Sequence, residues 1–403
     1  MTHYNVIIIG GGAAGFFTAI NTAENFPDLS VAILERTSNV LSKVKISGGG
    51  RCNVTHAEFI PKDLTTNYPR GERELFGPFH TFMTGDTMEW FDKRGVELKI
   101  EEDGRMFPVS NSSQTIIDCF TNETDRLGVE VLTNQVVVDF NRQDEQWLVK
   151  TKTAEFICDK LVVATGSSAK TWSKLKDLDL AVVNPVPSLF TFNCKDQRLQ
   201  DIPGVVVKNV SVKVKGESLE SSGPILVTHW GLSAPSILKL SAFGAIALAE
   251  RDYKFDIVVN FIQQSLEETL QDLKGLKQEL NKKTVLKFAQ FDVPKRLWYK
   301  LVEASDINDQ TRWADLNKQQ LEALAKQLTE AVFSINGKST FKDEFVTAGG
   351  LDLKELNFKT YQSKKYKHLF FAGEVINVDA VTGGFNFQNA WTSGYIVAQH
   401  IGL

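Results

Sequence analysis

The sequence is poor in the features that mark several specialised classes of protein. It has only four cysteines among 403 residues, with no Cys-x-x-Cys pair and no histidine pair at metal-ligand spacing. Neither a disulfide framework nor a zinc site is therefore predicted, and we expect no metal. Charge of one sign is not in excess either, because 45 Lys and Arg against 49 Asp and Glu give a formal net charge of −4. This balance offers no global electrostatic reason to bind nucleic acid, and a small-molecule substrate is expected instead.

Long uninterrupted apolar segments are also missing. The nearest approach is the stretch 4–23, which has no charged residue but contains four glycines and follows no basic segment. Its apolar residues fall into two runs around the glycines, which predicts a strand, a turn and a helix rather than a membrane span. With no export signal, we expect the protein to be cytoplasmic and not attached to a membrane.

The beginning of the chain predicts a β-α-β unit. The run 5–9 is short, apolar and rich in β-branched residues, as is typical of a parallel strand buried on both faces. Residues 13–24 have a helical pattern, and 30–34 form a second apolar run. A further strand is predicted at 161–164. The sequence therefore indicates a fold of the α/β class, built on a Rossmann-like parallel sheet.

Two inserts are expected to interrupt this Rossmann-like domain. Short alternating segments predict that 189–262 is a β-rich insert, a candidate substrate domain. Leucines at helical spacing predict a small helical insert over 263–340. We expect 1–188 and 341–403 to form one split domain around the two inserts.

The first glycine-rich motif predicts a dinucleotide site. Gly10 permits a tight turn, Gly12 lets the backbone approach a pyrophosphate, and Gly15 lets helix and strand pack closely. Glu35, at the end of the second strand, is placed to accept hydrogen bonds from ribose hydroxyls, and its charge disfavours a 2′-phosphate. This motif alone leaves FAD and NAD open. The expected contacts are Gly10, Gly12, Ala13, Ala14, Gly15, Glu35, Arg36 and the backbone near Val136.

A second glycine-rich segment, 47–53, favours FAD. Three consecutive glycines are costly inside a helix or a strand, but they suit a backbone that lies against a flat ligand. Arg51 can reach a phosphate or a flavin edge, and Asn53 offers a donor and an acceptor to the uracil-like ring of an isoalloxazine. The alternative is a flexible surface loop. The residues expected to line the flavin here are Lys43, Ser47, Gly48, Gly49, Gly50, Arg51, Cys52 and Asn53.

The third motif lies near the end of the chain. A strand delivers Glu374 beside Gly373, where the carboxylate can bind the hydroxyls of a ribityl chain. Gly383 and Gly384 then open a helix whose N-terminus can face the negative charge of a reduced flavin. The remaining residues expected to bind the cofactor are Ala164, Thr165, Gly166, Gly373, Glu374, Asp379, Gly383, Gly384, Phe385 and Asn386.

The sequence offers two candidates for the catalytic group, each with an alternative. Cys52 is either a redox-active thiol against the flavin or a small packing residue, and no second cysteine lies nearby in the sequence. His229 is either a general acid, since a hydride that reaches one carbon requires a proton on its neighbour, or a structural histidine of the β-rich insert.

These motifs together resemble known flavoproteins. The glycine motif with Glu35, the strand end 164–166 and the segment 372–374 are similar to the two-dinucleotide-fold flavoproteins of glutathione-reductase type. More closely, the segments 47–53, 227–235 and 373–386 resemble the BaiN-like flavoprotein family, over essentially the whole chain. Members are described as NAD(P)/FAD-dependent oxidoreductases or as aminoacetone-oxidase-family FAD-binding enzymes. The resemblance implies an FAD enzyme.

The chain departs from the pattern of that family at four positions. The family usually has asparagine where this chain has His56, and glycine where it has Ala234. It often has aspartate and tyrosine where this chain has Asn377 and Phe385.

We therefore expect an FAD-dependent oxidoreductase that moves a hydride between the flavin and a small or medium-sized organic substrate. No second glycine motif of this kind appears near the middle of the chain, so NAD(P)H is expected only as a transient donor. The alternatives are an oxidase that passes electrons to oxygen and a flavin-dependent protein that binds or modifies nucleic acid. The run of lysines at 274, 277, 282, 283 and 287 fits the last alternative, but such a run is more often a solvated helix face.

Overall fold

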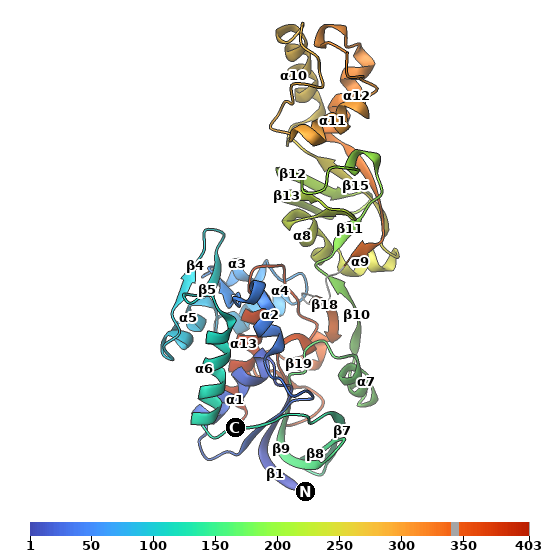
Figure 1. Cartoon of the computed structure of the whole chain (residues 1–403). Coiled ribbons are helices and arrows are strands. Elements are labelled where there is room, and N and C mark those ends of the chain that lie inside the picture. The colour runs from blue at the N-terminus through green and yellow to red at the C-terminus, as the bar shows by residue number, and fades with distance from the viewer. Residues whose placement is uncertain (340–345, 403) are drawn as a thin grey trace. The chain divides into compact units, whose positions relative to one another are not determined.

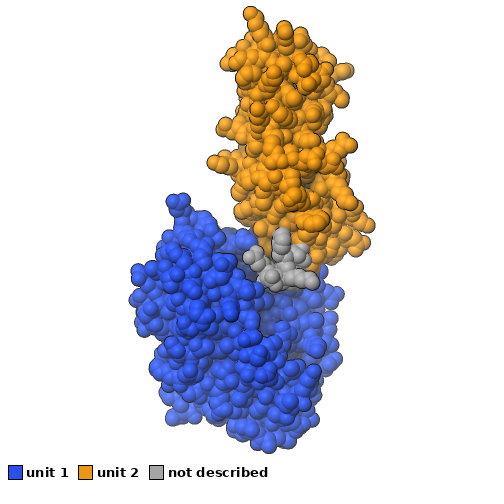
Figure 2. All heavy atoms as spheres, in the orientation of Figure 1, with its two compact units in different colours: residues 1–186, 346–403 blue, residues 187–345 orange. Residues whose placement is uncertain are grey.

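The computed structural model describes residues 1–339 and 346–402. The chain divides into two compact units, unit 1 of Met1–Val186 and Val346–Leu403 and unit 2 of Pro187–Phe345, which Figure 2 distinguishes by colour. The expected boundary at 340/341 lies outside the described residues. None of the helices in the described ranges is long and apolar enough to cross a lipid bilayer.

Unit 1 is built on a nine-stranded sheet. Five strands run parallel in the order β21 (Leu369–Phe371), β9 (Glu155–Val163), β1 (Thr2–Ile9), β2 (Val31–Leu34) and β6 (Glu130–Leu132). The short strands β19 (Leu356–Asn357) and β20 (Gln362–Ser363) extend the β21 edge, and β7 (Val137–Gln143) and β8 (Gln146–Thr151) form a hairpin against β9. The side chains of Val6, Ile7 and Ile8 are fully buried, as expected for a strand covered on both faces. The expected α/β fold is confirmed.

Helices cover this sheet. The first helix, α1 (Ala13–Asn25), packs against α13 (Phe385–His400) and α6 (Ser113–Arg126), and Figure 1 shows the three lying together. Phe16 and Phe17 of α1 are fully buried, within an aromatic cluster that includes Phe120 of α6. The other helices of this unit are α2 (Ser42–Gly50), α3 (Pro61–Thr65), α4 (Glu72–Phe79), α5 (Thr84–Asp92) and α7 (Ala169–Asp177).

A small antiparallel sheet accompanies the main one. Its strand order is β3 (Thr55–His56), β5 (Arg105–Pro108) and β4 (Leu98–Ile100). The chain leaves unit 1 along β10 (Val182–Ser188) and returns along β18 (Val346–Leu351), which pair with each other.

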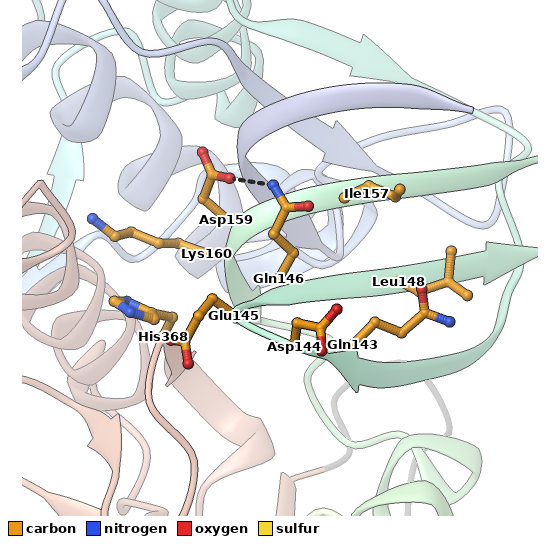
Figure 3. A pocket seen from close by; sticks show the side chains of 9 residues that line it. All are labelled: Gln143, Asp144, Glu145, Gln146, Leu148, Ile157, Asp159, Lys160 and His368. Atoms are coloured by element: carbon orange, nitrogen blue, oxygen red, sulfur yellow. Dashed lines mark hydrogen bonds between the residues drawn. The ribbon is translucent and has the colours of Figure 1, made fainter.

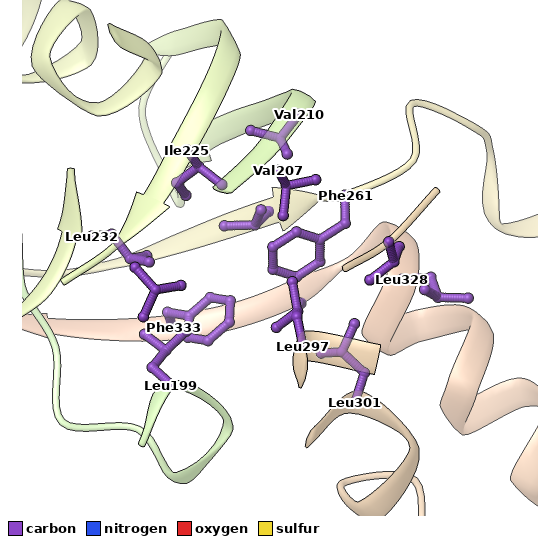
Figure 4. Close-up of a cluster of buried hydrophobic side chains, with 14 of the residues drawn as sticks. Leu199, Val207, Val210, Ile225, Leu232, Phe261, Leu297, Leu301, Leu328 and Phe333 are labelled. Atoms are coloured by element: carbon purple, nitrogen blue, oxygen red, sulfur yellow. The ribbon is translucent and has the colours of Figure 1, made fainter. Parts of the chain in front are cut away.

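Unit 2 contains a seven-stranded sheet. Its order is β16 (Ala331–Asn336), β15 (Lys254–Asn260), β12 (Val206–Val214), β13 (Glu220–Val227), β14 (Gly231–Ser233), β11 (Thr191–Asn193) and β17 (Lys338–Ser339). Its helices are α8 (Pro235–Phe243), α9 (Ala245–Glu250), α10 (Leu266–Glu279), α11 (Lys295–Glu303) and α12 (Lys318–Thr329). Figure 4 shows Leu297 and Leu301 of α11 and Leu328 of α12 in one apolar cluster with Phe261 and Phe333.

The expected helical insert therefore ends in strands. Residues 331–336 form β16, which pairs with β15 of the β-rich segment. Their side chains alternate strictly between buried and exposed, which is the period of a strand and not of a helix. The β-rich and helical segments consequently share one sheet and one apolar core.

Candidate functional site

The glycine-rich motifs meet at one edge of the parallel sheet. Gly10 follows β1, Glu35 follows β2, Ala164 follows β9 and Ala372 follows β21. Because these strands are parallel, their carboxyl ends lie along the same edge, which is where ligands bind in open α/β sheets.

The glycines of the first motif occupy their positions for different structural reasons. A Cβ on Gly10 would lie 2.4 Å from the carbonyl oxygen of Ala164, and a Cβ on Gly15 would lie 2.0 Å from that of Gly10. Neither position has space for a side chain, so glycine allows these backbone segments to pack against each other. Gly12 differs, because a Cβ there would meet no atom within 4 Å. The helix α1 begins directly after it without a side-chain cap, so the N–H groups of its first turn are available to an anion.

The carboxylate of Glu35 is oriented by the surrounding backbone. Its Oε2 accepts from the N–H of Gly11 at 2.9 Å, and its Oε1 accepts from the N–H of Thr37 at 2.9 Å. The backbone that leads to Val136 lies beside the backbone of Glu35, since Gln135 N–H donates to the Glu35 carbonyl oxygen at 2.8 Å. The predicted contact Arg36 is exposed.

Lys43 and Glu374 are brought together from distant parts of the chain. The Nζ of Lys43 lies 2.6 Å from Oε2 of Glu374, and a Cβ on Gly166 would lie 3.6 Å from that oxygen. The neighbouring Gly373 has a φ of +72°, and its N–H donates to Ser393 Oγ at 2.9 Å. Next to Gly166, the hydroxyl oxygen of Thr165 is buried without a hydrogen-bond partner. The ends of β9 and β21 and the first turn of α2 thus converge on one polar cluster.

The three consecutive glycines form a left-handed turn. Regular helical geometry in α2 stops at Ser47, and Gly48, Gly49 and Gly50 have φ values of +56°, +68° and +83°. A Cβ on Gly48 would lie 2.9 Å from the ring of Phe107, whereas one on Gly49 would meet no atom within 4 Å. The turn therefore packs on β5 through Gly48 and leaves the backbone of Gly49 open.

The side chains after this turn are largely engaged by the protein. The Nη1 of Arg51 lies 2.6 Å from Glu101 Oε1, and the guanidinium lies 3.9 Å from the ring centre of Phe107. Contact of Arg51 with a phosphate or flavin edge stays a prediction. Cys52 is fully buried, and burial raises the pKa of its thiol to about 12. A neutral, enclosed thiol favours the packing role over the redox role.

Asn53 joins two of the glycine-rich loops. In the orientation in which both the nitrogen and the oxygen of its amide form hydrogen bonds, the nitrogen donates to the carbonyl oxygens of Thr55 at 3.0 Å and Met106 at 3.2 Å. The amide oxygen accepts from the N–H of Gly384 at 3.0 Å. A Cβ on Gly384 would lie 2.6 Å from the carbonyl oxygen of Thr55. The N–H of Gly384 is thus used by the protein, which leaves the first turn of α13 itself, uncapped by any side chain, to face a ligand.

The loop before α13 is held by hydrogen bonds and an ion pair that involve side chains. Asn386 Oδ1 accepts from the N–H of Ala380 at 3.0 Å, and the hydroxyl of Tyr68 donates to the carbonyl oxygen of Phe385 at 2.6 Å. Asp379 forms a two-pronged ion pair with Arg70, and both side chains are largely buried. Direct cofactor contacts of Asp379 and Asn386 remain predictions.

One residue of this region was missed by the motifs. The Nδ1 of His56 lies 3.0 Å from the carbonyl oxygen of Gly383, and its ring lies over Phe385 at a centroid distance of 4.6 Å. Both His56 and Phe385 are departures from the family pattern, and they are in contact with each other. That joint departure is the signal in the sequence that marks the position.

The second catalytic candidate lies in unit 2. His229 is exposed in the turn between β13 and β14, beside Trp230, whose exposed fraction is 65%. The hydroxyl of Thr228 accepts from the N–H of Gly231 at 3.1 Å and fixes this turn.

Two cavities of unit 1 lie away from these motifs. One of about 620 Å³ lies beside the hairpin β7–β8, where Figure 3 shows Asp159 bound to Gln146, and Lys160 and His368 nearby. Another of about 490 Å³ lies among α1, α5, α6 and α13. None of the predicted cofactor residues lines either cavity. Within 1–339 and 346–402, no group of three His, Cys, Asp or Glu side chains is arranged to hold a metal ion.

Comparisons with known proteins identify the family and the fold. Residues 4–400 match the family described as HI0933-like protein Rossmann domain. The ribosomal RNA dihydrouridine synthase of Haemophilus influenzae is 26% identical over 409 residues, with 98% of each chain covered. The 3-dehydro-bile acid delta(4,6)-reductase of Clostridium scindens is 25% identical over 405 residues, with 97% of each covered. The structure of 3-ketosteroid-delta4-(5alpha)-dehydrogenase from Rhodococcus jostii matches with a TM-score of 0.50 at 13% identity, over 98% of this chain and 97% of that chain, a likeness in fold alone.

Proposed function

The chain belongs to the HI0933-like family of FAD-dependent Rossmann proteins, and on this basis we propose that it is a reductase that saturates a carbon–carbon double bond conjugated to a carbonyl group. FAD, bound in unit 1, is the proposed cofactor, and a nicotinamide nucleotide is the proposed transient donor. The β-rich part of unit 2 stays the candidate substrate domain.

The residues of unit 1 suit FAD. The observation that carries this is the space over Gly12, where the backbone is open and α1 begins without a cap. A pyrophosphate there would accept hydrogen bonds from the first N–H groups of α1. Glu35 would accept from the adenosine ribose, and the cluster of Lys43 and Glu374 would bind the ribityl and phosphate oxygens.

The isoalloxazine would lie between the turn 48–50 and the start of α13. When bound, FAD supplies a hydride carrier that accepts two electrons from a donor and passes them to a substrate. Asn53 holds the two loops at a defined separation, and the positive end of the α13 dipole favours negative charge beside it. Asn53 and the start of α13 need no rearrangement when the flavin is reduced, and they would therefore make its reduction easier.

The names of the relatives support the proposed type of reaction, the saturation of a carbon–carbon double bond conjugated to a carbonyl group. Dihydrouridine is uridine with a saturated carbon–carbon bond next to a carbonyl, and the bile-acid enzyme is named for reduction at positions 4 and 6 of a 3-oxo steroid. In the reduction of a double bond directly conjugated to a carbonyl group, a hydride adds to the β-carbon and a proton to the α-carbon. We carry over this shared chemistry and not either substrate.

Nucleic acid remains the first alternative to a small substrate. The near-neutral charge of the chain argues against it, whereas the name of the Haemophilus relative argues for it. The oxidase alternative has no support from these names.

The test is anaerobic reoxidation of the reduced flavoprotein. Protein that purifies with FAD is reduced with dithionite and mixed either with 4-androstene-3,17-dione or with unmodified ribosomal RNA. Recovery of the oxidised flavin spectrum with one of the two is expected, and the responding probe distinguishes the substrate classes. A protein that takes up no FAD, or whose reduced flavin is reoxidised by oxygen alone, would refute the proposal.

A further inference from the structure

The imidazole of His56 has a defined orientation at the junction of two glycine-rich loops. Its Nδ1 lies 3.0 Å from the carbonyl oxygen of Gly383, and its ring stacks on Phe385 at an interplanar angle of 28°. A carbonyl oxygen only accepts hydrogen bonds, so Nδ1 must carry the proton and donate it. The tautomer is thereby fixed, and Nε2 is the nitrogen that gains and loses a proton.

The surroundings of Nε2 depend on a glycine. A Cβ on Gly104 would lie 2.6 Å from Nε2, which is closer than any side chain tolerates. Gly104 has a φ of +83° and directly precedes β5, the strand that pairs with β3. Because Gly104 has no side chain, its backbone can approach the imidazole beside Nε2, and the ring is nevertheless only partly buried.

Other titratable groups at this junction are poor proton donors. The thiol of Cys52 is fully enclosed, and the buried hydroxyl of Tyr68 already donates to the carbonyl oxygen of Phe385. Asp379 is ion-paired with Arg70. Among the proton-bearing groups that the described residues bring to the Gly383 loop, the imidazole of His56 is partly exposed to solvent.

We propose that His56, where the family usually has asparagine, is the proton donor of the reduction in this chain, which rests on the proposed function. Bound, reduced FAD would supply the hydride that forms a C–H bond at the β-carbon, and the electron pair of the double bond would move to the α-carbon. The Nε2–H bond of the imidazolium breaks as a C–H bond forms at the α-carbon. The imidazole is left neutral with Nδ1–H still donated to Gly383, and water restores its proton. The two electrons come from the nicotinamide nucleotide that reduces the flavin.

Charged groups of the small sheet face this imidazole. Arg105 is its partner residue across β3 and β5, and Asp103 lies in the turn that precedes Gly104. Desolvation would raise the pKa of the Asp103 carboxyl, but hydrogen bonds from Arg105 and the charges of Arg105 and His56 hold it below its usual range. Arg105 is also within 3.5 Å of Glu101. The carboxylates of Asp103 and Glu101 thus offset the charge of Arg105 beside the imidazole.

The matched variants are His56→Asn and, as control, His80→Asn at the exposed end of α4. An asparagine amide can still donate to the Gly383 carbonyl oxygen but has no proton to transfer, so FAD affinity should stay at the wild-type value. The rate of reoxidation by the responding probe should fall about 10²-fold or more, the usual contribution of a general acid.

A second readout does not depend on turnover. In protein with ¹⁵N-labelled histidine and bound FAD, the signals missing from His56→Asn identify His56. We expect the neutral ring to carry its proton on Nδ1, which faces the carbonyl oxygen of Gly383. The inference would be overturned by a neutral form protonated at Nε2, or by an unchanged rate in His56→Asn. If neither probe reoxidises the wild-type flavin, the proposed function fails and this inference falls with it.

Discussion

The substitution Gly12→Ala separates binding from folding within the glycine-rich loop. A Cβ at this position would meet no atom within 4 Å, and the φ of −98° is ordinary for alanine. The free energy of unfolding of the FAD-free protein should therefore change by no more than about 0.5 kcal/mol. FAD should be affected differently, because the new methyl group would stand where a pyrophosphate approaches the start of α1.

The size of the loss follows from the hydrogen bonds at risk. Displacing the pyrophosphate from two backbone N–H groups removes two charge-assisted hydrogen bonds of about 1.5–3 kcal/mol each. The sum of about 3–6 kcal/mol corresponds to roughly 10²- to 10⁴-fold weaker binding. The assay is a titration of deflavinated protein with FAD, followed by quenching of flavin fluorescence, with denaturant unfolding of the same samples.

Two other glycines provide the comparison. Gly85→Ala, in α5 and equally free of neighbours, should leave FAD affinity unchanged and stabilise the protein by about 0.5–1 kcal/mol. Gly10→Ala should destabilise even the FAD-free protein, because its Cβ would lie 2.4 Å from a backbone oxygen. The reasoning would be refuted by Gly12→Ala that binds FAD like wild type, or by Gly12→Ala that unfolds as easily as Gly10→Ala.

Three further substitutions test separate parts of the account. Ala234 has φ +84° and ψ 173°, a region that suits only glycine, so Ala234→Gly should stabilise unit 2 by about 1 kcal/mol in denaturant unfolding; a net loss of stability would contradict the strain. Glu35→Ala should weaken FAD binding by about 1.5–3 kcal/mol without slowing reduction of FAD-saturated protein, and a slower reduction at normal affinity would show that its role lies at the ring. Cys52→Ala should keep the rate of flavin reduction, and native Cys52 should resist alkylation at neutral pH because its pKa is about 12; rapid labelling would contradict its enclosure.

The part of the fold that follows from local pattern was predictable. The apolar run of β1, the glycines after it and the carboxylate at the end of β2 lie within one β-α-β unit, so their spacing alone indicates their geometry. The left-handed turn at 48–50 was predictable for the same reason, since three glycines exclude a regular element.

The parts that depend on distant residues were not predictable from one sequence. Nothing in the spacing indicates that Lys43 meets Glu374, or that Asn53 bridges Gly384, because each pair is more than three hundred residues apart. The strand at 331–336 was hidden by the leucine spacing of the helices before it, although its own alternation has period two.

The site side chains follow the same division. The sequence identifies Arg51 as a cation beside glycines, but only the fold brings Glu101 and Phe107 against it. His56 appeared in the sequence merely as a departure from a family pattern, and its meaning depends on Gly104 and Gly383 folding against its ring.

The central claim is that the reduced flavin saturates a conjugated double bond. It is tested most directly by the product of a single anaerobic turnover of reduced protein with the probe that reoxidises it. The account predicts one equivalent of product per FAD, heavier by two hydrogens and without the ultraviolet absorption of the conjugated system. Unchanged probe, with reoxidation that requires oxygen and yields peroxide, would contradict it.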